Sequence, residues 1–380
     1  MSYCKEPKVV ICCPSLSIQG GVSNYYRVLK SKLSTCENIR FLEIGGTNRS
    51  RLGSLWAAIV EPITYVVYIF INRAEIIHLN PSLQPNSVLR TAVFVVLGKL
   101  LGRKIIVFWR GWNKDTEKVI REKYNRIFRL VFGKVDLTLV LAEEFREKLQ
   151  VMGFMHPILV TTTIYDDSKI NTYKHSLMQA DKPPGQFSLF FMSRIVEDKG
   201  VRKSLEAFSI LKESIPELIF NVAGDGAMLQ QLKEEYAEID DIKFLGNIVD
   251  DSKYNKLVSS DAFLFPSTYG EGMPNAVLEA MACGCPIITT HVGGLADFFK
   301  DEVHGLVVNG TDSQQLADAI RRLVKDEVLR LSVGKNNMVF AEKHFSATVV
   351  ADHLIRVYQA VCDNEINSLP KAWYEAEIST

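Results

Sequence analysis

Two carboxylates stand close together in the stretch GEGMPNAVLEAMACGCP, which runs from Gly270 to Pro286. Glu271 precedes a predicted helix, and Pro274 suits the first helical position. Glu279 lies inside that helix, about 7 Å further along the axis at 1.5 Å per residue. Two acceptors at this separation suit hydroxyl groups at the two ends of one ligand whose anionic middle meets the helix N-terminus.

A plainer interpretation of these acids is structural. Glu271 would only complement the helix dipole, and Glu279 would be a surface acid. The segment AMACGCPIITT that follows Glu279 is apolar, however, which favours a position in a packed region. A nucleotide sugar, with ribose hydroxyls, a diphosphate and sugar hydroxyls in a row, has the layout that two such acids could hold.

A pair of cations follows another predicted strand, in FMSRIVEDKGV. Arg194 and Lys199 are five residues apart, and Gly200 opens the next helix. At the carboxyl edge of a strand they would neutralise a diphosphate, the arginine by forked hydrogen bonds and the lysine as a point charge. The alternative is a solvated turn in which Glu197 and Asp198 pair locally with them.

Two further loops follow predicted strands in the first half of the chain. Gly20 and Gly21 precede a helix whose first turn has free backbone N–H groups, which suits a phosphate or diphosphate. A glycine pair alone is more often only a tight turn, and it is not the spaced fingerprint of a dinucleotide fold. In KIIVFWRGWNKD, Arg110 directly follows a buried strand.

Strand and helix patterns alternate along the chain, which predicts parallel sheets with helices on both faces. The pattern lapses in the polar stretch after residue 161 and restarts at residue 187. We therefore expect two doubly wound Rossmann-like α/β domains that face each other across a cleft, over residues 1–170 and 185–360. The tail from about residue 360 to 380 is expected to pack back on the first domain.

The net charge of zero hides a split between the two halves of the chain. Residues 1–180 carry 25 Lys and Arg against 14 Asp and Glu, an excess of +11, and the remainder carries −11. The basic half predicts an anionic partner, or else a favourable dipole between domains. Seven cysteines, several in apolar patterns, indicate buried thiols in a reducing compartment.

The most apolar segment runs from Leu55 to Ile71 and is interrupted by Glu61 and Pro62. It is shorter than the roughly 20 residues needed to span a bilayer. A buried core helix is one interpretation, and a helix that rests on a membrane surface is the other.

Four stretches together resemble glycosyltransferase family 4, the retaining enzymes of GT-B fold. They are FMSRIVEDKG, NVAGDG, FLFPSTYGEGMPNAVLEAMACGCPIITTHVGG and HGLVVNG. The resemblance covers residues 187–358 well and the first half more loosely. It implies a cytoplasmic enzyme, peripheral on the inner face of the cell membrane, with a nucleotide-sugar donor and no nucleic-acid partner.

The resemblance also implies roles for the residues above. Glu271, Arg194 and Lys199 would act at the reacting end, the glutamate on donor-sugar hydroxyls and the two cations on the diphosphate. Glu279 would bind the ribose hydroxyls. The remaining donor-binding residues would be Gly20, Gly21, Arg110, Gly272, Met273, Asn275, Phe244 and Leu245.

This sequence departs from the family's pattern at three places. Arg110 stands where many relatives have a histidine, so it would contact phosphate or an acidic group instead. Ser193 replaces a usual glycine, and TTTIYDD replaces the usual asparagine-glycine turn. The acceptor side is therefore less standard than the donor side.

Retaining transfer in this family is thought to need no protein base, because the departing phosphate oxygen takes the acceptor proton. The chain contains no Asp-x-Asp triplet, so we expect no metal and no other cofactor. The expected acceptor is a glycan carried on a lipid diphosphate. Alternatives are a nucleotide-sugar 2-epimerase of the same fold, for which His291 lies near the right region, and a non-catalytic nucleotide-sugar binder.

Overall fold

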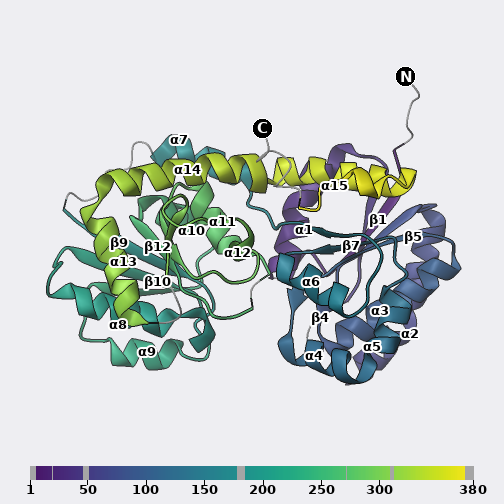
Figure 1. Ribbon diagram of the computed structural model, residues 1–380, viewed down its shortest axis with the longest axis horizontal. Coiled ribbons are helices and arrows are strands. Elements are labelled where there is room, and N and C mark those ends of the chain that lie inside the picture. Colours follow the sequence, from purple (N-terminus) through teal and green to yellow (C-terminus); the bar gives the residue numbers. More distant parts are fainter. Residues whose placement is uncertain are drawn as a thin grey trace. The chain divides into compact units, whose positions relative to one another are not determined.

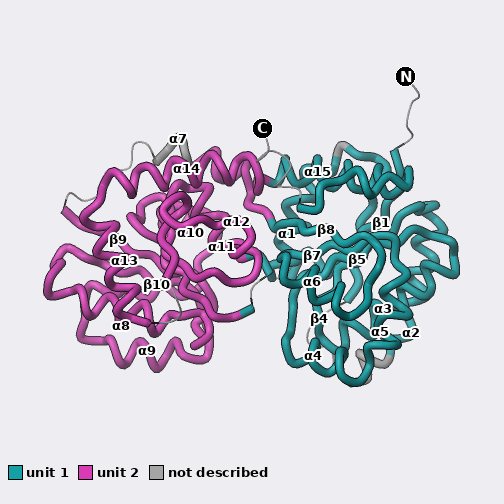
Figure 2. Tube along the Cα trace, viewed as in Figure 1, with its two compact units in different colours: residues 1–163, 270–273, 347–380 teal, residues 164–269, 274–346 magenta. Residues whose placement is uncertain are grey.

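The computed structural model describes residues 6–18, 20–45, 51–177, 185–270, 272–308 and 312–372. The chain divides into two compact units, shown in different colours in Figure 2. Unit 1 consists of residues 1–163, 270–273 and 347–380, and unit 2 of residues 164–269 and 274–346.

Unit 1 is built on a six-stranded parallel sheet with the order β2-β1-β3-β5-β7-β8. Its strands are β1 (Val9–Cys13), β2 (Ile39–Glu43), β3 (Ile76–Leu79), β5 (Lys104–Phe108), β7 (Leu137–Val140) and β8 (Ile158–Val160). The central strands are rich in Val, Ile and Leu and are buried on both faces, as expected of a sheet covered by helices. A separate short pair joins β4 (Ser82–Leu83) to β6 (Gly111–Trp112).

Helices connect these strands and cover the sheet (Figure 1). They are α1 (Gly21–Lys32), η1 (Leu33–Thr35), α2 (Arg51–Ile71), α3 (Pro85–Leu100), α4 (Lys114–Val119), η2 (Ile120–Tyr124), α5 (Asn125–Phe132), α6 (Glu143–Val151), α15 (Ala347–Asp363) and η4 (Ile366–Ser368). α15 packs beside α1, and its Tyr358 hydroxyl lies 2.8 Å from Nδ1 of His78 in β3.

Unit 2 has a second six-stranded parallel sheet, with the order β11-β10-β9-β12-β13-β14. Its strands are β9 (Phe187–Met192), β10 (Leu218–Ala223), β11 (Ile242–Gly246), β12 (Ala262–Phe265), β13 (Ile287–Thr289) and β14 (Gly305–Val307). β9 lies between β10 and β12, so the loops after these three strands emerge at one edge of the sheet.

The helices of unit 2 alternate with its strands. They are α7 (Asp167–Leu177), η3 (Glu197–Lys199), α8 (Val201–Lys212), α9 (Leu229–Glu235), α10 (Asp250–Ser259), α11 (Asn275–Ala282), α12 (Leu295–Phe298), α13 (Ser313–Lys325) and α14 (Glu327–Phe345). α8 and α13 lie side by side over one hydrophobic core, to which Phe208, Phe220 and Leu316 contribute. Each unit is therefore a parallel α/β fold of the predicted class.

The division of the chain differs from the predicted boundaries at residues 170, 185 and 360. Unit 2 begins at Ile164, and α15, which starts at Ala347, already belongs to unit 1. α14 ends at Phe345 and α15 begins at Ala347, so the helical pattern is nearly continuous and does not show where the chain passes to the other unit.

The apolar segment from residue 55 to 71 is part of one helix, α2, with Pro62 inside it. The interpretation of this segment as a buried core helix is wrong. Tyr65 and Ile69 are buried, but Trp56 is 70% exposed and Phe70 is 59% exposed. No helix in the described ranges is long and apolar enough to cross a membrane.

Candidate active site

Arg194 and Lys199 lie in the loop that follows β9, at the carboxyl edge of the unit 2 sheet. Arg194 is exposed, whereas Lys199 is only 5% exposed. Gly200, with a φ of 75°, separates η3 from α8, and a Cβ there would lie 2.3 Å from the carbonyl oxygen of Pro266. Only glycine allows this turn, which is why the second cation is followed by a glycine.

The loop with the two cations is fastened to the loop after β12. The carbonyl oxygen of Asp198 accepts hydrogen bonds from the amides of Thr268 and Tyr269, at 2.9 and 3.2 Å. The Ser267 hydroxyl also donates to this oxygen, at 3.2 Å. The cations are thereby held next to the turn that leads into the two-glutamate stretch.

Tyr269 is a site residue that the sequence reasoning missed. The Lys199 ammonium lies 4.6 Å from the centre of the Tyr269 ring, and the Arg194 guanidinium lies 5.5 Å from it. A ring face attracts both cations and fixes their positions. The only signal in the sequence is the aromatic residue directly before the GEG stretch, which is too common to be diagnostic.

The pKa of Lys199 is lowered from 10.5 to about 8. Burial is the main cause, and the positive charge of Arg194 adds to it, while Asp198 acts in the opposite direction. An anion beside Lys199 and Arg194 would offset both the burial of the ammonium and the repulsion from the guanidinium. This arrangement therefore argues against the solvated turn and fits a diphosphate.

Glu279 lies in α11 and is 5% exposed, so the interpretation as a surface acid is wrong. Its Oε1 atom accepts a hydrogen bond of 2.7 Å from Nζ of Lys253 in α10. The second carboxylate oxygen can still accept a hydrogen bond from a ligand hydroxyl. Lys253 is a partner that sequence spacing did not indicate.

The start of α11 differs slightly from the prediction. Pro274 precedes the first helical residue, Asn275, and has extended backbone angles. Glu271 lies outside the described residues. Gly272 and the buried Met273 belong to unit 1 by their contacts, and the Met273 carbonyl oxygen accepts from the Thr163 hydroxyl at 3.3 Å.

Phe244 and Leu245 are in β11, and both are half-buried. Phe244 packs against the core of unit 2. Their strand ends at Gly246, whose carbonyl oxygen accepts from the Gly224 amide at 2.8 Å. The loop after β10 therefore lies between the ends of β9 and β11, and these residues border the same edge as the two cations.

In unit 1, α1 begins at Gly21, with Gly20 as its N-cap residue. Both glycines are exposed, and a Cβ at either would meet nothing within 4 Å. The helix has no side-chain cap. Its first backbone N–H groups therefore face an open surface, as anion binding at a helix N-terminus requires.

Arg110 follows β5 and lies against aromatic rings. Its guanidinium carbon is 3.8 Å from the centre of the Tyr25 ring and 4.3 Å from that of Phe108. Nε and Nη1 are buried and form no hydrogen bond with any described residue. Nε2 of His78 is likewise buried without a hydrogen-bond partner among the described residues. Burial, helped by the Arg110 charge, lowers the pKa of His78 to about 3, so this histidine is neutral.

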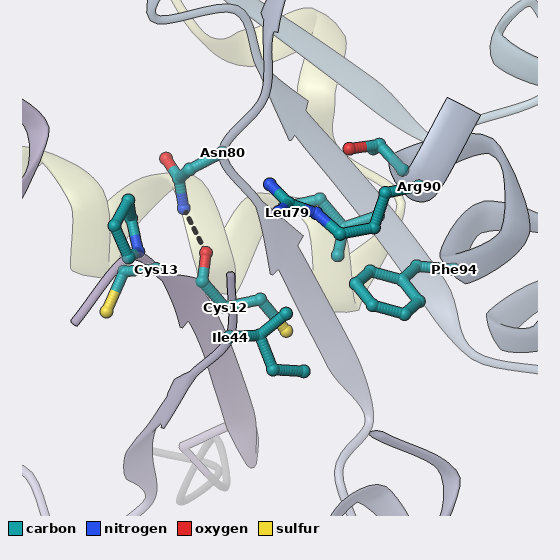
Figure 3. A pocket seen from close by; sticks show the side chains of 9 residues that line it. Cys12, Cys13, Ile44, Leu79, Asn80, Arg90 and Phe94 are labelled. Atoms are coloured by element: carbon teal, nitrogen blue, oxygen red, sulfur yellow. Dashed lines mark hydrogen bonds between the residues drawn. The ribbon is translucent and has the colours of Figure 1, made fainter. Parts of the chain in front are cut away.

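A small cavity lies beside this edge of unit 1, lined among others by Cys12, Asn80 and Arg90 (Figure 3). Nδ2 of Asn80 donates to the Cys12 carbonyl oxygen at 3.0 Å. The cavity volume of about 20 Å³ is enough for roughly one water molecule. It is too small for a sugar. Its lining residues include the ends of β1 and β3.

Within the described ranges, no three His, Cys, Asp or Glu side chains gather as metal ligands would. Cys12, Cys13, Cys36 and Cys362 are free thiols, and burial raises the pKa of Cys13 to about 12.

Comparison with known proteins points to one family. Residues 176–339 match the model of the family described as glycosyl transferases group 1. This region contains both cations, Glu271 and Glu279. Over residues 176–339, the chain is therefore similar to the group 1 glycosyltransferases.

This chain has two curated relatives that are named for capsular polysaccharide and teichuronic acid biosynthesis. It is 28% identical over 229 residues to the capsular polysaccharide biosynthesis glycosyltransferase CapM of Staphylococcus aureus, over 58% of this chain and 57% of that protein. It is 26% identical to the putative teichuronic acid biosynthesis glycosyltransferase TuaC of Bacillus subtilis, over 63% of this chain and 60% of that protein. The aligned part thus spans less than two thirds of either relative.

Among solved structures, the fold is similar to that of Anabaena Alr3699/HepE in complex with UDP and glucose. The TM-score is 0.67 at 16% identity, and the match covers 92% of this chain and 99% of that chain. The GT-B fold expected from the resemblance is confirmed. At this identity the similarity extends to the fold alone.

We expect diphosphate binding by this protein to depend on the charge of Lys199. In the free protein the ammonium loses its proton as pH rises through about 8. Affinity for a nucleoside diphosphate should therefore fall as pH rises from about 7 to 9. Lys199→Arg, whose guanidinium stays charged, should flatten this profile. Isothermal titration calorimetry across the pH range measures both.

Lys199→Ala and Arg194→Ala are the companion variants for that measurement. Loss of a charge-assisted contact costs on the order of 1.5–3 kcal/mol, or roughly 10- to 150-fold in affinity. Arg322→Ala serves as a control, because this exposed arginine pairs with Glu302 away from the β9 loop. Unchanged affinity in both site variants would contradict the assignment of the diphosphate site.

Proposed function

We propose that this protein is a retaining glycosyltransferase that moves a hexose from a nucleotide-diphosphate sugar to a hydroxyl of a lipid-linked or growing surface-polysaccharide acceptor. The observation that carries the proposal is the edge of the unit 2 sheet. There, a buried lysine and an arginine share Tyr269, and a loop joined by the Asp198 carbonyl leads into the two-glutamate stretch.

The donor is proposed from the chemistry of that edge. Arg194 and Lys199 supply two positive charges for a diphosphate, and Glu279 has one carboxylate oxygen left for ribose hydroxyls. A similar fold in HepE was solved with UDP and glucose, which supports a nucleotide-sugar donor here. In unit 1, the first turn of α1 after Gly20 and Gly21 offers backbone N–H groups that suit a phosphate.

In the proposed reaction, the bond between the sugar anomeric carbon and the departing diphosphate oxygen breaks. The acceptor oxygen bonds to the same face of that carbon, and its proton passes to the departing phosphate oxygen. Arg194 and Lys199 stabilise the charge that develops on the diphosphate, and Glu271 orients the sugar through its hydroxyls. No side chain needs to act as a base, and the two cations take the place of a metal.

The acceptor is proposed from the relatives and from unit 1. CapM and TuaC are described as enzymes of capsular polysaccharide and teichuronic acid biosynthesis. A polysaccharide that grows at a membrane needs an acceptor held by a lipid. Exposed apolar side chains of α2, such as Trp56 and Phe70, fit a position at the membrane surface. We therefore place the protein in the cytoplasm, peripheral on the inner face of the membrane.

A nucleotide-sugar 2-epimerase is the second candidate, because it shares the fold. It needs a proton-abstracting group, and His291 is exposed with its Nε2 atom 3.0 Å from the Phe299 carbonyl oxygen. An assay with labelled donors separates the candidates, since transfer requires an acceptor and epimerisation does not. A non-catalytic binder would turn over neither.

We expect Glu271→Ala to abolish transfer and leave the fold intact, because the carboxylate is proposed to hold the donor sugar. Product formation is measured with a labelled nucleotide sugar, and thermal melting monitors the fold. Glu327→Ala, which removes an exposed acid in the first turn of α14, is the matched control. Turnover near the parental rate in the Glu271 variant would refute its assigned role.

We expect transfer to continue after exhaustive chelation of divalent metals, because the chain lacks the Asp-x-Asp ligands and has two cations at the diphosphate site. The rate is measured with and without a chelator, before and after manganese or magnesium is added back. Full loss of activity that either metal restores would contradict metal-independent transfer.

We expect Arg110 to bind an anionic group of a substrate. The Tyr25 and Phe108 rings fix its guanidinium plane, and its buried N–H groups have no described acceptor. Arg110→Ala should raise the KM for the substrate that bears the anionic group roughly 10- to 150-fold. Arg110→Lys should recover only part of this, because an ammonium lacks the planar fork. Equal KM values in all three proteins for donor and acceptor would exclude this role.

A further inference from the structure

The outer face of α2 is largely apolar from residue 56 to residue 71. Between residues 56 and 71, six large side chains are exposed, and they recur at the spacing of one helical stripe: Trp56, Ile59, Ile63, Val67, Phe70 and Ile71. A helix at a water-facing surface normally places charges on that stripe. Here Glu61 is the only charged residue between Arg51 and Arg73, and it accepts a hydrogen bond from the Gly45 amide.

α3 continues this apolar surface. Leu89, Val93, Val96 and Leu100 are exposed at the spacing of a second helical stripe. The two helices pack directly on each other, since the Tyr65 ring stacks on the Phe94 ring and its hydroxyl donates to the Phe94 carbonyl oxygen at 2.8 Å.

α5 adjoins α3 on its other side and completes the layer (Figure 1). The connections from β2 to β3, β3 to β5 and β5 to β7 all cross the sheet in the same direction. Because such crossovers are right-handed, α2, α3 and α5 cover the same face of the sheet. We call the exposed side of these three helices the apolar layer.

One margin of the apolar layer is basic. Residues 114–134, which form α4, η2 and α5, contain seven Lys and Arg against three Asp and Glu. One of those acids, Glu117, is buried and accepts from the Trp112 indole N–H at 2.7 Å. On α5 the exposed Ile127 and Leu130 alternate with Arg126 and Arg129. Apolar and cationic side chains are therefore presented together.

We propose that the apolar layer is a membrane-docking surface, which rests on a bilayer that contains acidic lipids. The stripe from residue 56 to 71 is roughly 22 Å long at 1.5 Å per residue, the size of an interfacial helix. Acidic headgroups complement the basic margin, and the apolar stripes enter the boundary between headgroups and acyl chains. This proposal rests on the exposed side chains of unit 1 and deepens the proposed function by locating the membrane-held acceptor.

A bilayer fits this surface better than a second copy of the chain does. A two-fold dimer buries the same patch on both subunits, so it would add two basic margins to one interface that offers few acids to pair with them. Repulsion between them would oppose association, whereas an acidic membrane attracts every one of these charges.

Vesicle flotation tests the proposal with the full chain. The parental protein should float with vesicles of phosphatidylcholine and phosphatidylglycerol more than with phosphatidylcholine alone, and salt should reduce but not abolish binding. Ile59→Asp/Phe70→Asp should lower the bound fraction roughly tenfold or more, because two anchors become charged. Lys123→Gln/Arg126→Gln/Arg129→Gln should remove the preference for acidic lipid and keep the salt-insensitive part.

Val328→Asp/Leu331→Asp is the matched control. Val328 and Leu331 lie in α14 and are 80% and 65% exposed. Their substitution by aspartate introduces the same charge change outside the apolar layer. Thermal melting verifies that each variant is folded. Flotation of Ile59→Asp/Phe70→Asp at the parental level, or an equal loss in the control pair, would overturn the proposal.

Two further measurements keep this proposal separate from the proposed function. If light scattering shows a parental dimer that Ile59→Asp/Phe70→Asp converts to a monomer, the apolar layer joins two copies and the membrane proposal is wrong. Transfer to a water-soluble acceptor should be unchanged in that variant. Loss of flotation with normal transfer supports the docking surface, whereas flotation without any transfer by the parental protein refutes only the proposed function.

Discussion

The contact on which the proposed donor site depends is between two stretches of backbone. The loop after β9 contacts the loop after β12 at two points. Gly200 lies close to the Pro266 carbonyl oxygen, and the Asp198 carbonyl oxygen accepts hydrogen bonds from two backbone amides. This contact is possible because β9 and β12 are neighbours in a parallel sheet and end at the same edge. Without it, neither cation would have a fixed position relative to the turn before α11.

Two like charges held at fixed positions repel each other, and this repulsion raises the free energy of the site. Lys199 is buried beside Arg194, so its pKa falls to about 8, and the Tyr269 ring offers both cations a partial compensation. An anionic ligand would offset the remaining repulsion between the two cations. Part of its binding free energy would therefore come from the relief of this repulsion. Electrostatic preorganisation of this kind is what a reaction without a protein base requires.

Much of this could be predicted from the sequence, because the informative signals are local. Alternating strand and helix patterns predicted the fold class. Lys199, directly before Gly200 at the start of a predicted helix, indicated a loop that could bind an anion. Pairings across the fold were not predictable. Lys253, which holds Glu279, lies 26 residues away on another helix, and Tyr269 gains its role only from the Asp198 contact.

The apolar helix α2 shows the limit of periodicity most clearly. A sequence that is apolar nearly all round fits a core helix and a membrane-resting helix equally well, since both need an uncharged surface. Exposure separates them: Tyr65 turns inward against α3, while Trp56 and Phe70 turn outward. A soluble fold would gain little from such a stripe and would risk aggregation, so the stripe implies an apolar partner. The basic margin on the same layer is the reason why we propose an acidic bilayer as the partner, since a bilayer of this kind would satisfy both features at once.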